Sequence, residues 1–122
     1  MQLHTHIMFQ DGQARDAAAC YAALPGGELL GEVDHGGTIA ARVRVAGQEI
    51  VLFDSPVQHE FGLTPAMSLV LVVDSASQVD EIVQQLTSDG GAVLMPVDKY
   101  DFAERFGWCV DRFGVSWQIT SR

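Results

Sequence analysis

Two histidines near the N-terminus have the clearest capacity for chemistry. His4 and His6 alternate with Leu3, Thr5 and Ile7, and positions two apart on a strand share one face of a sheet. An imidazole titrates near neutral pH, so it serves as a general base, a hydrogen-bond partner or a metal ligand. A half-buried histidine that donates to a neighbouring strand would give the same pattern. Both interpretations of His6 stay open at this point.

The last strand-like segment carries a second set of polar groups. Its apolar and polar residues alternate, which predicts one buried face and one face formed by Ser116, Gln118 and Thr120. The amide of Gln118 has donors and an acceptor, so it suits a polar ligand. A polar group satisfied within the sheet is the alternative. The segment is therefore a candidate pocket wall.

The two cysteines do not indicate nucleophilic catalysis. Cys20 falls in a predicted helix and Cys109 in a predicted strand, and neither has a base nearby in sequence. The first ten residues are short and polar for a secretory signal. We therefore expect a cytoplasmic protein whose cysteines are free thiols.

The charge of the chain restricts its partners. It has 122 residues, a formal charge of -9 and a pI of about 4.6. Such a surface repels nucleic acid and anionic membranes, although a local pocket can still bind a small anion. No apolar run has the length of a membrane span. We expect a small molecule as ligand, with no nucleic acid and no membrane as partner.

The hydrophobic periodicity predicts the same order of elements twice. In the first half we expect a strand at 3–9, a helix over 14–21 and strands at 28–33, 38–45 and 49–53. In the second half we expect a strand at 68–73, a helix over 79–86 and strands at 92–95, 105–110 and 115–120. Asp11 is the expected cap of the first helix, and Ser75 is among the candidate caps of the second.

This repetition predicts an internal duplication. Pro25-Gly26-Gly27 and Asp89-Gly90-Gly91 end the two helices in the same way. We expect one α+β domain over 1–122, with modules at about 1–54 and 67–122 and a linker at 55–66. Each βαβββ module would form a curved mixed sheet with its helix outside, leaving a central cup. A second loop is expected at 96–104.

The closing hairpin resembles that of a known family. Asp111-Arg112-Phe113-Gly114, followed by Trp117 and Gln118, resembles PhnB-like proteins of the vicinal oxygen chelate (glyoxalase/bleomycin resistance/dihydroxybiphenyl dioxygenase) superfamily. Phe106-Gly107-Trp108 and Leu94-Met95-Pro96 extend the resemblance. It implies the duplicated fold and a homodimer. Some PhnB-like sequences are described as ubiquinone-pathway methyltransferases, but no glycine-rich nucleotide loop follows the first strand here.

The resemblance also implies where a metal would be held. Metal-dependent members use four side chains from the inner faces of the cup, and these positions fall on His6, Phe53, Ser68 and Gln118. Phe53 cannot bind a cation, and a neutral serine and glutamine are poor ligands beside a single imidazole. Asp54 is adjacent but alternation turns it away. No metal is therefore expected, and His6 is the candidate ligand if one binds.

Other side chains are candidates for lining the pocket. His4 shares the face of His6, and Trp108 and Tyr100 lie near the closing hairpin and the second loop. Tyr100, Phe102 and Phe106 would form an aromatic rim, with core packing as the alternative. Two arginines of the first half are expected on an outer, solvent-exposed strand face, namely Arg42 and Arg44.

Two functions follow from these residues. The first is a metal-free, dimeric binding module for a small, partly apolar molecule, with His6, Phe53, Ser68 and Gln118 in the pocket. The alternative is a metal-dependent enzyme of lyase or dioxygenase type that uses His6 as a ligand. Because no second catalytic group accompanies His6, the sequence assigns no catalytic residue and leaves catalysis open.

Overall fold

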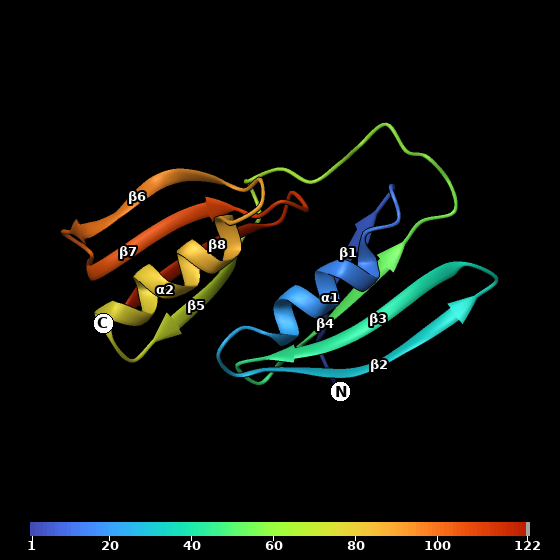
Figure 1. Cartoon of the computed structure of the whole chain (residues 1–122), viewed down its shortest axis with the longest axis horizontal. Helices are drawn as coiled ribbons and strands as arrows, with labels where there is room; N and C mark the ends of the chain where they lie inside the picture. The colour runs from blue at the N-terminus through green and yellow to red at the C-terminus, as the bar shows by residue number, and fades with distance from the viewer. Residues whose placement is uncertain (122) are drawn as a thin grey trace. The chain divides into compact units, whose positions relative to one another are not determined.

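The computed structural model describes residues 1–121 and shows the duplication directly (Figure 1). The chain forms two compact units, Met1–Phe61 and Gly62–Arg122. Each unit contains one helix and one four-stranded sheet in the order strand, helix, three strands. The fold is α+β with two βαβββ modules, as the periodicity predicts. No helix among the described residues is long and apolar enough to cross a membrane.

Unit 1 is built from five elements. They are β1 (Thr5–Phe9), α1 (Ala14–Ala22), β2 (Gly27–His35), β3 (Thr38–Val45) and β4 (Gln48–Asp54). The sheet order is β1-β4-β3-β2, in which β1 runs parallel to β4 and the other pairs are antiparallel. The first strand therefore lies beside the last strand of its own unit.

Unit 2 repeats this topology. Its elements are β5 (Leu69–Val73), α2 (Ala76–Thr87), β6 (Ala92–Tyr100), β7 (Ala103–Val110) and β8 (Ser116–Ser121). The sheet order is β5-β8-β7-β6, and β5 runs parallel to β8. In this order, β5, β8, β7 and β6 correspond to β1, β4, β3 and β2 of unit 1. The segment 55–68, which connects β4 to β5, has no regular secondary structure.

Each helix covers one face of its sheet. The apolar side of α1 is fully buried and packs chiefly on β3; it consists of Ala14, Ala17, Ala18 and Tyr21. Alanines bring the helix close to the sheet, where every second side chain of β3 is buried; these are Ile39, Ala41, Val43 and Val45. In unit 2, α2 buries Val79, Ile82, Val83 and Leu86. We call the opposite side of each sheet its helix-free face.

The start of α1 differs from the prediction. Asp11 does not cap the helix; its carboxylate accepts from the side chain of Gln13, which is the N-cap residue and makes no side-chain cap. The N–H of Ala14 instead donates to Oδ1 of Asp54 at 2.8 Å. This buried carboxylate at the end of β4 supplies negative charge where the helix dipole favours it. Asp54 thus points away from the helix-free face, as alternation predicts.

The start of α2 follows the prediction. Ser75 is the N-cap, and its Oγ accepts from the backbone N–H of Gln78. The side chain of Gln78 accepts from the backbone N–H of Ser75 at 3.2 Å, which completes a capping box. The signal is local in sequence, so it could be recognised without knowledge of the fold.

The prediction of a loop at 96–104 is wrong. Strand β6 continues through Pro96 to Tyr100, and only Asp101 and Phe102 form the turn to β7. Because β6 is an edge strand, a proline can lie in it without breaking a hydrogen bond of the sheet interior. Three register shifts along the β6–β7 pair accompany this irregular strand.

Candidate functional site on the helix-free sheet faces

The helix-free face of unit 1 brings two predicted residues together. His6 lies opposite Val51 in the β1–β4 pair, and Met8 lies opposite Phe53. The rings of His6 and Phe53 are 5.7 Å apart between centroids and tilted by 43°. An imidazole beside an aromatic ring suits a partly apolar ligand, while the aromatic ring offers no ligand to a cation.

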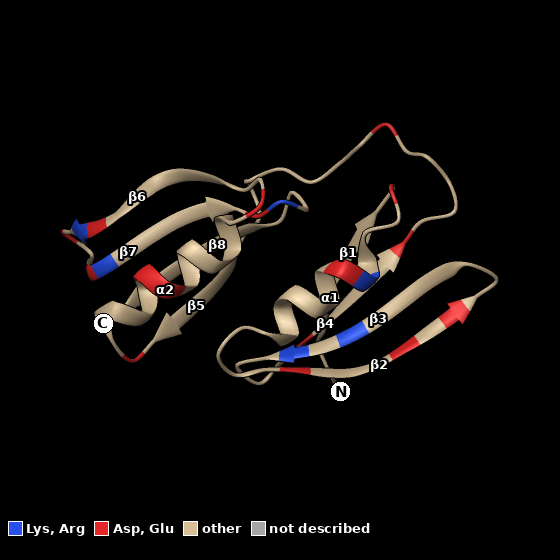
Figure 2. Cartoon of the chain, in the orientation of Figure 1, with Lys and Arg blue, Asp and Glu red and all other residues tan. Residues whose placement is uncertain are grey.

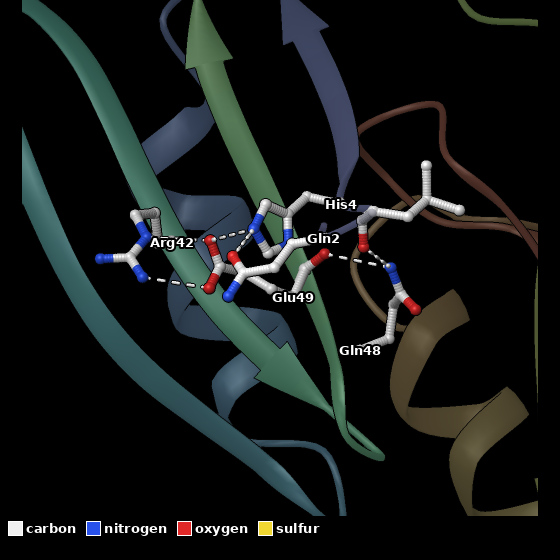
Figure 3. A network of polar contacts seen from close by, with 6 residues as sticks. Gln2, His4, Arg42, Gln48 and Glu49 are labelled. Atoms are coloured by element: carbon white, nitrogen blue, oxygen red, sulfur yellow. Dashed lines mark hydrogen bonds and ion pairs between the residues drawn. The ribbon is translucent and has the colours of Figure 1, made fainter.

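A polar network that includes His4, Arg42 and Glu49 lies on the sheet of unit 1 (Figure 3). Nε and Nη2 of Arg42 donate to the two carboxylate oxygens of Glu49, each at 3.0 Å. Nε2 of His4 lies 3.7 Å from the same carboxylate and 3.1 Å from Oε1 of Gln2. The side chain of Glu49 is 13% exposed. The network therefore fixes the position of Arg42 and His4.

The hydrogen bond from Arg42 lowers the pKa of Glu49, and the charges of Arg42, His4 and Arg44 act in the same direction. A lowered pKa in the folded protein means that the ionised pair stabilises the fold above the unfolded pKa of a glutamate. This contribution is lost as the pH falls through the lowered pKa of Glu49. Glu49 is therefore ionised at neutral pH and holds Arg42 in place.

The sheet face predicted for Arg42 and Arg44 is wrong. Arg42 and Arg44 are exposed, as expected, but they alternate with the residues that α1 covers and so lie on the helix-free face. Figure 2 shows these basic segments on β3. Arg44 pairs with Glu28 at 3.4 Å, across from it in the β2–β3 pair. The alternation of buried and exposed residues in β3 could be predicted from its sequence. Which face of the sheet the helix covers depends on tertiary packing and could not.

Unit 2 contains a compact cluster of neutral polar groups. The Oγ atoms of Ser68 and Ser116 are 2.7 Å apart, and Nε2 of Gln118 donates to Oγ of Ser68 at 3.3 Å. The indole Nε1 of Trp108 donates to Oγ of Ser116 at 2.8 Å. We name Ser68, Ser116, Gln118 and Trp108 the serine–glutamine cluster. It joins three of the predicted site residues through Ser116.

Strand register explains why these side chains meet. Gln118 lies opposite Trp108 on β7 and opposite Val70 on β5, so the three occupy one row across the helix-free face. Ser116 lies two positions before Gln118 on β8 and therefore on the same face. Trp117 between them is 1% exposed and, by strand alternation, points to the helix-covered side.

The turn before β8 is organised by one buried carboxylate. Oδ1 of Asp111 accepts from the backbone N–H groups of Phe113 and Val115 at 2.9 and 3.0 Å. Oδ2 accepts from the indole N–H of Trp117 at 3.0 Å. Gly114 has a φ of 90°, which favours glycine over other residues. The residue pattern Asp-Arg-Phe-Gly thus fixes where β8 begins and hence where Ser116 and Gln118 point.

The aromatic residues near the β6–β7 turn form the predicted cluster. The rings of Tyr100 and Phe102 are stacked at 5.5 Å, and Phe106 meets both of them edge-on. Phe106 is buried, whereas Phe102 is 67% exposed. The hydroxyl of Tyr100 donates to the backbone oxygen of Pro96 at 2.7 Å. Phe106 therefore packs in the core, as the alternative predicted, and Phe102 is exposed beside it.

The cysteines are free thiols, as predicted. Cys109 is buried, and burial raises its pKa to about 12, with a further contribution from the charge of Asp111. A thiol with this pKa stays protonated at neutral pH and is a poor nucleophile.

The four positions implied by the superfamily do not fit a divalent metal. His6 is the single strong ligand among them; Phe53 has no donor atom, and Ser68 and Gln118 are neutral and bonded to each other. Among residues 1–121, no three His, Cys, Asp or Glu side chains gather to hold a metal ion. His59 in the linker stacks on Phe61 and contacts Oγ of Ser55 at 3.2 Å.

Sequence reasoning missed three residues of these faces. Ser116 was assigned to the right face but not to the ligand set, although it joins Ser68 to Trp108. Arg42 and Glu49 were not proposed as site residues. Their signal was the strand alternation itself, since Glu49 is two residues from Val51 and shares its face.

Comparisons with known proteins agree with this architecture. The family described as 3-demethylubiquinone-9 3-methyltransferase matches residues 1–120. A PhnB protein from Bacillus cereus is 35% identical over the whole of both chains, with a TM-score of 0.91. Protein PA1353 from Pseudomonas aeruginosa is 27% identical over 100% of this chain and 98% of its own, with a TM-score of 0.83. None of the curated proteins matches.

A more distant structure shares the fold. The glyoxylase/bleomycin resistance protein/dioxygenase domain from Frankia is 16% identical over 99% of this chain and 90% of its own, with a TM-score of 0.75. This likeness concerns the βαβββ architecture alone. The chain belongs to the family described as 3-demethylubiquinone-9 3-methyltransferase, and its whole length is similar to a PhnB protein.

Proposed function

We propose that this protein binds a small, partly apolar molecule on its helix-free sheet faces without using a metal ion. The observation that carries the proposal is the serine–glutamine cluster, in which the positions that would hold a metal carry neutral, mutually bonded groups. On the other unit, the ring pair of His6 and Phe53 offers an aromatic surface and a hydrogen-bonding nitrogen. Both are suited to an organic ligand.

Methyl transfer from S-adenosylmethionine is not part of the proposal, despite the description of the family. The segment that follows β1 is Gln10-Asp11-Gly12-Gln13, which lacks the repeated glycines of a nucleotide-binding loop. The backbone of the single glycine has a φ of 76° and serves the turn into α1. These residues provide no recognisable cradle for that cofactor.

Thermal unfolding in the presence of metals tests the proposed function. We expect nickel, manganese and zinc ions to leave the melting temperature of the wild type unchanged, since one imidazole holds a divalent ion weakly. The matched variant His6→Ala should then behave in the same way with and without metal. A rise of several degrees in the wild type that disappears in His6→Ala would establish a metal site and overturn the proposal.

We further propose that the protein works as a homodimer. The support is the edge strand β5, on whose helix-free face Val70 and Val72 are 57% and 49% exposed. Apolar side chains on an unpaired strand favour association with another chain. Light scattering after size-exclusion chromatography should give the mass of two chains, and Val72→Lys should shift it towards one. A single-chain mass for the wild type at micromolar concentration contradicts this proposal.

A further inference from the structure

The serine–glutamine cluster has a defined direction of hydrogen bonding. The indole N–H of Trp108 has no acceptor capacity of its own, so Ser116 is the acceptor in that pair. Ser116 is 2% exposed, and its own proton must therefore reach a protein acceptor. Oγ of Ser68 lies 2.7 Å away. Trp108 thus donates to Ser116, and Ser116 donates to Ser68.

This direction leaves the hydroxyl proton of Ser68 available to a ligand. Oγ of Ser68 already accepts from Ser116 and from Nε2 of Gln118. Both lone pairs of the hydroxyl are then occupied, and its proton is free to donate outwards from a half-buried position. A donor at the end of a hydrogen-bonded chain is polarised by the bonds before it. Ser68 is therefore a strengthened neutral donor.

Gln118 offers the complementary group. Its Nε2 faces Ser68, and its Oε1 makes no hydrogen bond with the part of the chain that the structure describes. Among the described residues no buried side-chain oxygen lacks a hydrogen-bond partner, so Oε1, which makes no such bond, is accessible. A donor from Ser68 and an acceptor from Gln118 thus lie side by side. Rotation of the Gln118 amide by 180° would turn Oε1 towards Ser68 and Nε2 outwards. Nε2 would then be the outward donor and Oγ of Ser68 the acceptor, so the pair would still offer one donor and one acceptor.

The surroundings of this pair are apolar and uncharged. Val70 and Trp108 flank Gln118 in the same row of the sheet. The one basic residue of β5, β7 and β8 is Arg105, which pairs with Asp80 of α2 at 2.7 Å on the helix-covered side. An anionic group beside Ser68 would therefore lose hydration without gaining an opposite charge.

We infer that Ser68 and Gln118 bind an uncharged ligand group that presents a carbonyl oxygen and an N–H on the same edge, as a lactam or primary amide does. The carbonyl accepts from the hydroxyl of Ser68, and the N–H donates to Oε1 of Gln118. The apolar body of the ligand lies against Trp108 and Val70. This inference rests on the proposed function and specifies the chemistry of its ligand.

Three compounds of similar size separate this chemistry from its alternatives. δ-Valerolactam has the carbonyl and the N–H, N-methyl-δ-valerolactam lacks the N–H, and valerate is an anion. The readout is the indole N–H signal of Trp108 in ¹H–¹⁵N spectra, assigned with Trp108→Phe. We expect δ-valerolactam to shift this signal and to bind about tenfold more tightly than the N-methyl compound, the effect of one hydrogen bond. Valerate should bind more weakly still.

Variants locate the effect. Ser68→Ala and Gln118→Leu should each weaken δ-valerolactam about tenfold. Thr120→Val is the matched control, because Thr120 lies on the same face of β8 but outside the cluster, and it should leave the affinity unchanged. Where a variant fails to fold, the three compounds on the wild type still decide the matter.

The contrary results are equally distinct. Equal affinity for the N-methyl compound, preference for valerate, or no shift of the Trp108 signal with any compound overturns the inference. The metal titration reports separately on the proposed function. Metal binding with lactam selectivity intact overturns the metal-free function alone, whereas no metal binding with valerate preferred overturns the ligand chemistry alone.

Discussion

Asp111→Ala should reduce the free energy of unfolding by about 4 kcal/mol, because it removes the acceptor of three buried donors. The backbone N–H groups of Phe113 and Val115 and the indole N–H of Trp117 would lose this partner in a region where Asp111 itself is 3% exposed. Urea unfolding followed by tryptophan fluorescence measures the loss. The turn before β8 would loosen with it, so the serine–glutamine cluster should lose its geometry.

Asn at position 111 provides the matched control. The amide oxygen can still accept the two backbone N–H groups, while its NH₂ group would face the indole N–H of Trp117, donor against donor. Asp111→Asn should therefore cost less than Asp111→Ala. Trp117→Phe should cost less in the Asn background than in the wild type, a coupling that a double-mutant cycle measures. An Asp111→Ala protein within about 1 kcal/mol of the wild type would contradict this role.

Gly27→Ala should destabilise unit 1 by about 3 kcal/mol or more. A Cβ atom at this position would lie 2.3 Å from the backbone oxygen of Tyr21 and 2.8 Å from that of Ala22. Both atoms belong to the end of α1, so relief requires the helix to move away from β2. Urea unfolding followed by circular dichroism measures the change.

Gly31→Ala is the control on the same strand. Its Cβ would meet nothing within 4 Å, and its φ is not in the left-handed region. We expect a change within about 0.5 kcal/mol, as for other surface substitutions. Equal stability of the Gly27 and Gly31 variants would show that the helix–strand contact tolerates a side chain.

The repeated glycines of the sequence have the same roles in both units. Gly26 and Gly90 follow the two helices with φ values of 76° and 115°. Gly27 and Gly91 come next and pack against the preceding helix, where a Cβ on Gly91 would lie 2.6 Å from Cα of Thr87. The repeated glycine pairs that indicated a duplication thus reflect the same backbone requirement after each helix, namely a positive φ followed by close packing against the helix. It could be predicted because glycine alone satisfies it.

Local patterns predicted the elements that depend on their own residues. The spacing of Ala14, Ala17, Ala18 and Tyr21 identified α1 and its buried side. Strand β3 was predicted with its observed bounds, because its alternation is unbroken. The turn at Asp111 and Gly114 followed from residue types that favour turns. In each case, one segment contains all the information.

Contacts between distant segments were beyond the sequence. Asp54 rather than Asp11 meets the start of α1, and it lies 40 positions after Ala14, whose N–H it accepts. Pro96 argues for a loop unless β6 is known to be an edge strand. The face of Arg42 depends on where α1 packs. Each of these facts requires the assembled sheet.

The candidate site was predicted as residues rather than as a network. His6 and Phe53 do meet, and so do Ser68, Gln118 and Trp108. Tyr100 instead belongs to the aromatic cluster with Phe102 and Phe106. Ser116 could not be ranked above other small polar residues without the 2.7 Å contact to Ser68. That contact joins two separate polar groups into one hydrogen-bonded cluster.

The metal content of the untagged protein, purified without chelators, tests the central claim most directly. Elemental analysis should find nickel, manganese, iron and zinc far below one ion per chain, because the positions of Phe53, Ser68 and Gln118 lack strong ligands. One tightly held ion per chain, absent from protein carrying His6→Ala, would contradict a metal-free binding module.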